Sequence, residues 1–85
     1  MKKEIYVLSA YGQVKAVILA ATELELGKKT ALAIQEEESA EEGTTTVNLG
    51  CIGDWGEDTN IVAVYVNNGE QVTNTDYTLR KTVSY

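Results

Sequence analysis

The stretch Ile61-Val62-Ala63-Val64-Tyr65-Val66 (residues 61–66) and the Asn67-Asn68-Gly69 that follows it decide the fold class. The first part is apolar on both faces, which is typical of a central strand covered on two sides. A short buried helix would show the same pattern. Asn and Gly tolerate the positive φ angles of type I′ turns, so residues 67–69 predict a tight turn. This combination favours a β-rich domain.

The chain beyond this turn ends in the clearest strand pattern of the sequence, from Tyr77 to Tyr85. One face of this predicted strand consists of Tyr77, Leu79, Lys81, Val83 and Tyr85, and the other of Thr78, Arg80, Thr82 and Ser84. Such alternation is typical of a half-buried strand. Because it runs to the last residue, we expect a terminal strand that could serve as a sheet edge.

The N-terminal third predicts a hairpin. Glu4–Ser9 is rich in β-formers, and Tyr11-Gly12-Gln13 offers a turn. The next segment, Val14–Leu26, allows two interpretations. Val14, Ala16, Ile18 and Ala20 alternate as in a strand, whereas Val14, Val17, Ile18, Ala21 and Leu24 recur at helical spacing before Gly27-Lys28-Lys29. We favour a strand that pairs with the first one.

The middle of the chain predicts two more strands and two loops. Thr30–Gln35 places Leu32 and Ile34 on one face of a third strand, and Thr44–Leu49 forms a fourth. Glu36–Gly43 is expected to be a charged loop, and the glycine-rich Gly50–Asn60 an irregular one. The sequence of 85 residues therefore predicts one domain, residues 1–85, that is mainly β, or α+β with one short helix. We expect five to six mostly antiparallel strands in a twisted sheet or small barrel.

Charge is distributed very unevenly along the chain. Ten carboxylates and no Lys or Arg lie between Lys29 and Arg80, and the net charge is −6. This balance argues against direct binding to nucleic acid and to anionic membranes, which both attract Lys and Arg. A single cysteine, Cys51, and the lack of a long apolar run favour a cytoplasmic protein.

The residue types that most enzymes need are scarce. Histidine is absent, so His-based catalysis and the commonest metal ligand are excluded. Cys51 lies in an acidic segment, which disfavours a reactive thiolate, and we interpret it as a small packing residue. Asp54, Glu57 and Asp58 surround Trp55 without the ligand spacing of a calcium loop. We also expect little room for a substrate cleft of the usual ~300–1,000 Å³. The sequence thus predicts no enzyme, cofactor or metal.

Two acidic segments remain as candidate binding features. Each has a plain interpretation, a solvated loop, and a sharper one, carboxylates that take the place of phosphates in a basic groove. Trp55 either folds back over the core or anchors an interface. In the sharper interpretation the partner-binding residues are Glu36, Glu37, Glu38, Glu41, Glu42, Asp54, Trp55, Glu57 and Asp58.

One resemblance concerns roughly residues 30–60. The N-terminal hairpin, Leu32-Ala33-Ile34-Gln35, an acidic loop, Thr46-Val47-Asn48-Leu49 and Asp58-Thr59-Asn60 together resemble a family of small uncharacterised proteins of phages, plasmids and conjugative elements in gut Firmicutes. The chain departs from that family after Asn60, where a polar amphipathic helix is expected. The resemblance implies a mobile-element setting, in which small acidic proteins often inhibit host defence nucleases.

The leading hypothesis is therefore a non-enzymatic acidic protein that blocks a positively charged surface, for example on a restriction or CRISPR nuclease. A first alternative is a small assembly domain that oligomerises or pairs through an edge strand, with Tyr77–Tyr85 as that edge. A second alternative is a binder that sequesters a small molecule.

Overall fold

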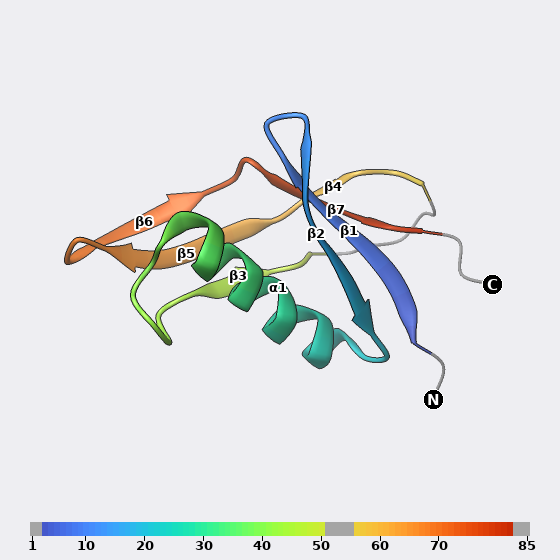
Figure 1. Ribbon diagram of the computed structural model, residues 1–85, viewed down its shortest axis with the longest axis horizontal. Helices are drawn as coiled ribbons and strands as arrows, with labels where there is room; N and C mark the ends of the chain where they lie inside the picture. Colours follow the sequence, from blue (N-terminus) through green and yellow to red (C-terminus); the bar gives the residue numbers. More distant parts are fainter. Residues whose placement is uncertain (1–2, 51–55, 83–85) are drawn as a thin grey trace.

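The computed structural model describes residues 3–50 and 56–82, which form seven strands and one helix (Figure 1). In chain order these are β1 (Glu4–Ala10), β2 (Gln13–Ala20), α1 (Glu23–Glu38), β3 (Thr46–Asn48), β4 (Thr59–Asn60), β5 (Val62–Asn67), β6 (Glu70–Asn74) and β7 (Tyr77–Lys81). The strands form two antiparallel sheets, ordered β2-β1-β7-β4 and β3-β5-β6. The expected fold class, mainly β with antiparallel strands and one helix, is confirmed; the described strands number seven rather than five to six, and they form two open sheets rather than a single sheet or a closed barrel.

The β1–β2 hairpin follows from local turn chemistry. Tyr11 and Gly12 have φ angles of 55° and 74°, so both central residues lie in the left-handed region that a type I′ turn requires. β2 pairs with β1 from Ala10↔Gln13 to Glu4↔Ala20, with a shift of register between Leu8 and Ser9. The strand interpretation of Val14–Leu26 is therefore right as far as Ala20, and wrong beyond it.

A second, longer hairpin joins the two sheets. Its turn is Asn68-Gly69, with φ angles of 53° and 79°, as the sequence predicted. β5 and β6 pair from Asn67↔Glu70 to Ala63↔Asn74, and a bond from the Ile61 amide to the Tyr77 carbonyl at 3.1 Å continues the pairing. β4 then pairs with β7 in the other sheet, where Asn60 faces Thr78. The segments β4–β5 and β6–β7 are thus the two arms of one bent hairpin that belongs to both sheets.

β7 corrects the expectation of a terminal edge strand. It lies between β1 and β4: one edge pairs with β1 over Tyr77–Lys81, and the other pairs with β4 at Thr78 and Leu79 and accepts backbone bonds from Ile61 and Gly56 at its two ends. Tyr77 and Leu79 are fully buried, which confirms the predicted face, and residues 83–85 lie outside the described residues. Among the described strands, the sheet edges are instead β2, β3, β4 and β6.

α1 is the largest departure from the sequence prediction. The expected strand Thr30–Gln35 and the start of the expected loop Glu36–Gly43 both belong to this helix. Thr22 caps it, accepting a hydrogen bond from the Glu25 amide at 3.1 Å, and Glu25 accepts one from the Ala21 amide at 2.7 Å. The helix ends at Ser39, whose φ of 53° places it in the left-handed conformation.

The core lies between α1 and the two sheets, because the helix contacts β2 of one sheet and β3 of the other. Figure 1 shows α1 lying next to both β2 and β3. The buried apolar side chains are Leu8, Ala10, Ile18, Ala20, Leu26, Ile34, Ile61, Ala63, Tyr65, Tyr77 and Leu79. Leu26, Thr30 and Ile34 recur every fourth residue, which is the helical period that places them on one face. In the part of the chain that the structure describes, no helix is long and apolar enough to cross a membrane.

Candidate functional site

The first acidic segment forms one end of the molecule, which we call the acidic end: Glu36, Glu37, Glu38, Glu41, Glu42 and Glu70. The first three occupy the last turn of α1, and that turn contains no basic residue. A helix C-terminus carries a partial negative charge, so each acid there is unfavourable by about 0.3–1 kcal/mol at low salt. The last turn of α1 therefore carries acids where basic residues would be the favourable choice.

Glu38 has a structural task at the acidic end. Its carboxylate accepts hydrogen bonds from the hydroxyls of Tyr77 at 2.5 Å and Tyr65 at 3.3 Å, and Asn74 donates to the Tyr65 hydroxyl at 3.3 Å. Burial, and then the bond to Glu38, raise the pKa of Tyr77. Glu38 therefore fixes the end of α1 against the long hairpin and is not available as a free partner contact.

Glu37 and Glu41 are also engaged within the chain. Glu37 pairs with Lys15 of β2 at 3.0 Å. Glu41 accepts a hydrogen bond from the Gly69 amide at 3.3 Å, and its own amide donates to the Val66 carbonyl at 2.9 Å. These bonds hold the loop after α1 beside the β5–β6 turn, which brings Glu70 to the same end.

Glu36 and Glu42 are the acids that remain available. Both are exposed, and neither carboxylate makes a hydrogen bond or ion pair within residues 3–50 and 56–82. Of the five acids predicted in this segment, these two are thus the ones best placed to meet a partner. Sequence alone did not separate them from their neighbours, because the distinction depends on contacts to distant strands.

The second acidic segment lies far from the first. Glu57 and Asp58 are exposed just before β4, and Asp58 faces Arg80 at 3.9 Å. Asp54 and Trp55 lie outside the described residues. Figure 1 places the start of β4 and the loop after α1 at opposite ends of the longest axis. The described acids of the two segments therefore lie at opposite ends of the molecule and not on one continuous face.

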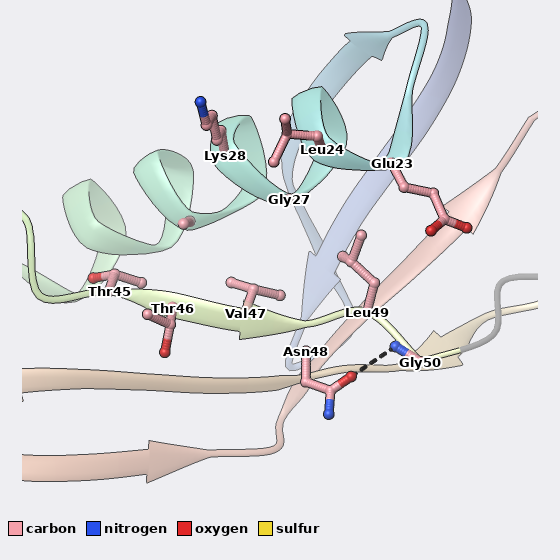
Figure 2. Close-up of a pocket in the computed structure, with 11 residues that line it drawn as sticks. Glu23, Leu24, Gly27, Lys28, Thr45, Thr46, Val47, Asn48, Leu49 and Gly50 are labelled. Atoms are coloured by element: carbon pink, nitrogen blue, oxygen red, sulfur yellow. Dashed lines mark hydrogen bonds between the residues drawn. The ribbon is translucent and has the colours of Figure 1, made fainter.

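A groove between α1 and β3 was not anticipated from the sequence. It has a volume of about 730 Å³, and Figure 2 shows the two walls. Its lining consists of Glu23, Leu24, Gly27, Lys28, Ala31 and the six consecutive residues 45–50. The expectation of little room for a cleft is therefore wrong as regards volume. Among these lining residues, Glu23 and Lys28 are the ionisable ones.

Metal binding finds no support in the side-chain geometry. Within the described ranges, no three His, Cys, Asp or Glu side chains come together in a group that could hold a metal ion.

Comparisons with protein-family models, curated proteins and solved structures found no match for this chain.

Proposed function

We propose that this chain is a non-enzymatic binding protein whose acidic end occupies a positively charged surface on a partner protein. The observation that carries the proposal is the placement of Glu36 and Glu42. Both carboxylates are exposed without a described partner, beside a helix C-terminus that already disfavours negative charge. A cationic surface would relieve this repulsion on binding, which gives the complex a favourable electrostatic term.

Nucleic-acid-binding enzymes are the target class that best fits this chemistry. Their grooves are lined with Lys and Arg to neutralise phosphates, and carboxylates at the same spacing would compete for those groups. A defence nuclease of the host cell, opposed by a small acidic protein of a phage or plasmid, is the specific form of the proposal. Both proteins would act in the cytoplasm.

The test uses purified restriction and CRISPR nucleases and a fluorescently labelled DNA duplex. Added protein is expected to displace the DNA, with an apparent affinity that falls as salt rises from low to physiological concentration. A Glu36→Gln, Glu42→Gln double variant should weaken displacement about tenfold, or roughly 1.4 kcal/mol. The matched control is Glu57→Gln, Asp58→Asn, which removes the same number of charges at the opposite end.

The control should displace DNA almost as well as the unmodified chain. Equal losses in the two double variants would show that only net charge matters, and would contradict a specific role of the acidic end. Displacement that is insensitive to salt would also contradict it.

The alternative of a small-molecule binder receives support from the volume of the groove, which falls within the usual ~300–1,000 Å³ range. The alternative of assembly through Tyr77–Tyr85 lacks such support, because β7 is an interior strand over its described residues.

A further inference from the structure

The groove between α1 and β3 runs along the edge of a strand rather than over its face. A strand that presents one face contributes alternate residues, because successive side chains point to opposite sides. Here six consecutive residues, 45–50, line the groove. β3 pairs with β5 on one side, and no described strand pairs with its other side. The groove is therefore bordered by backbone groups that another strand could pair with.

Gly27 places no side chain on the helical wall of the groove. Glycine in a helix interior is less favourable than alanine by about 0.8–1.0 kcal/mol. Among the described residues, an added Cβ would meet one atom, the Leu49 Cδ1 at 3.9 Å, which is an ordinary contact distance. A residue that costs stability without a packing reason is expected where another backbone approaches closely. The groove is the space next to it.

Polar groups in the groove also lack partners. The Thr45 hydroxyl is buried and makes no hydrogen bond within the described part of the chain. Lys28 is exposed and forms no ion pair there, in contrast to the neighbouring Lys29, which pairs with Glu25 at 3.1 Å. Lys28 and Thr45 also line a smaller hollow of about 270 Å³ that extends the same groove towards Gln35. An unpaired cation midway along the groove favours an occupant with a carboxylate.

Two leucines flank the groove. Leu24 is 70% exposed and Leu32 is 59% exposed, the two largest values among the helix's apolar side chains. Leu24 lines the larger hollow and Leu32 the smaller one, so the apolar rim extends along the groove. From residue 24 to residue 35 a helix rises about 17 Å, which is the length of roughly five residues of extended chain.

We propose that the groove binds an extended segment of a partner protein, which adds a strand to the free edge of β3. The segment would be about five residues long, would place apolar side chains against Val47 and Leu49, and would carry a carboxylate opposite Lys28. Main-chain hydrogen bonds supply affinity in this mode, while the pockets for side chains select the sequence. The smaller hollow reaches Gln35 and Gly43, next to the acidic end, but no acid of that end lines either hollow, so the segment would be bound by contacts other than those of the acidic end.

The experiment is selection of a displayed random-peptide library against the full chain. The enriched peptides are expected to alternate apolar and polar residues, to lack proline, and to contain Asp or Glu at one position. A synthetic peptide with the enriched sequence, added to isotope-labelled protein, should shift the amide resonances of Gly27, Lys28 and residues 45–50. Enrichment of no peptide above background would overturn the proposal, as would resonance shifts confined to other surfaces.

Three variants make the result specific. Gly27→Leu fills the groove with a better helix former and should weaken peptide binding at least tenfold while the melting temperature does not fall. Lys28→Glu should change the selected residue from Asp or Glu to Lys or Arg. Val17→Ser, on the exposed face of β2 and away from the groove, should bind as the unmodified chain does.

Peptide binding that survives Gly27→Leu would contradict the proposed site, and an unchanged preference in Lys28→Glu would contradict the proposed carboxylate. Sedimentation of the chain alone covers a further outcome. A dimer that Gly27→Leu dissociates would identify the occupant as a second copy and overturn the assignment to a different partner.

Discussion

Glu38 connects three separate elements through its backbone and side chain. Its carboxylate accepts from Tyr65 of β5 and Tyr77 of β7, while its carbonyl accepts from the Asn67 side chain at 2.9 Å. Hydrogen bonds to a charged group contribute about 1.5–3 kcal/mol each to stability. We therefore expect Tyr77→Phe to lower the free energy of unfolding by about 1–3 kcal/mol, as measured by urea denaturation at pH 7. Tyr11→Phe, which removes an exposed hydrogen bond to Asp76 at 3.0 Å, is the control and should cost less.

The same substitution also tests the titration of Tyr77. Burial and the bond to Glu38 raise its pKa above the usual 10.0, so the unfolded chain ionises first as pH rises. The stabilisation that protonated Tyr77 contributes is therefore fully present below pH 10 and is lost as pH rises above 10. The unmodified chain should lose stability above pH 10 more steeply than Tyr77→Phe does. Parallel pH profiles of the two proteins would contradict this role of Tyr77.

Glu25 provides an acid-sensitive contact at the other end of α1. The bond from the Ala21 amide, and then the contact with Lys29, lower the pKa of Glu25 from 4.5 to about 2. Because the folded value is depressed, the stabilisation is present above pH 4.5 and is lost as pH falls towards 2. Glu25→Gln should be less stable than the unmodified chain at pH 7, and the difference should disappear near pH 2. A constant difference between Glu25→Gln and the unmodified chain across this range would contradict the prediction.

At the scale of elements, the sequence predicted the two hairpins, because their turns depend on local residue chemistry. Tyr11-Gly12 and Asn68-Gly69 both adopt positive φ angles, and the strands beside them pair as expected. It failed on α1, because the alternation of Leu32 and Ile34 imitates a strand. The local signal for the start of this helix is Thr22 with Glu25: the Thr22 hydroxyl accepts from the Glu25 amide, and the Glu25 carboxylate accepts from the Ala21 amide. Leu24 and Leu32 are exposed, which weakens the amphipathic pattern on which helix recognition depends.

The candidate site was predicted less well than the fold, and for a physical reason. The acids of residues 36–42 were recognised, but their separation into bonded and free groups depends on Lys15, Gly69, Tyr65 and Tyr77. These contacts join residues distant in sequence, so no local pattern reveals them. Gly27 was a visible signal of the groove only once the surrounding segment was known to be helical.

Gly27→Ala tests whether the fold itself needs glycine in α1. The position has an ordinary helical backbone, and an added Cβ finds 3.9 Å of space before the Leu49 side chain. We expect the variant to raise the free energy of unfolding by about 0.5–1 kcal/mol, measured by urea denaturation. A loss of stability instead would show that α1 and β3 pack more closely than the groove implies. Ala31→Gly, at the next position on the same side, should lower stability by a similar amount.

At the scale of the whole molecule, negative charge opposes folding. The region from Thr30 to Leu79 holds ten acids and no base, and a net charge of −6 favours expansion through self-repulsion. Added salt screens such repulsion over about 8–10 Å at 0.10–0.15 M. The unmodified chain should therefore become more stable as salt rises from low to physiological concentration, which thermal unfolding would measure.

Glu36→Gln relates this repulsion to function. Removing an unpaired charge from the last turn of α1 should stabilise the free protein by about 0.3–1 kcal/mol at low salt, and the gain should shrink as salt is added. The same variant should bind a basic partner less tightly, since the charge that destabilises the free chain is the one the partner neutralises. Glu57→Gln, at the opposite end, should alter neither property by as much. If Glu36→Gln gained stability and kept full affinity, the strain at the helix end would be unrelated to binding, and the acidic end would be only a solvated surface.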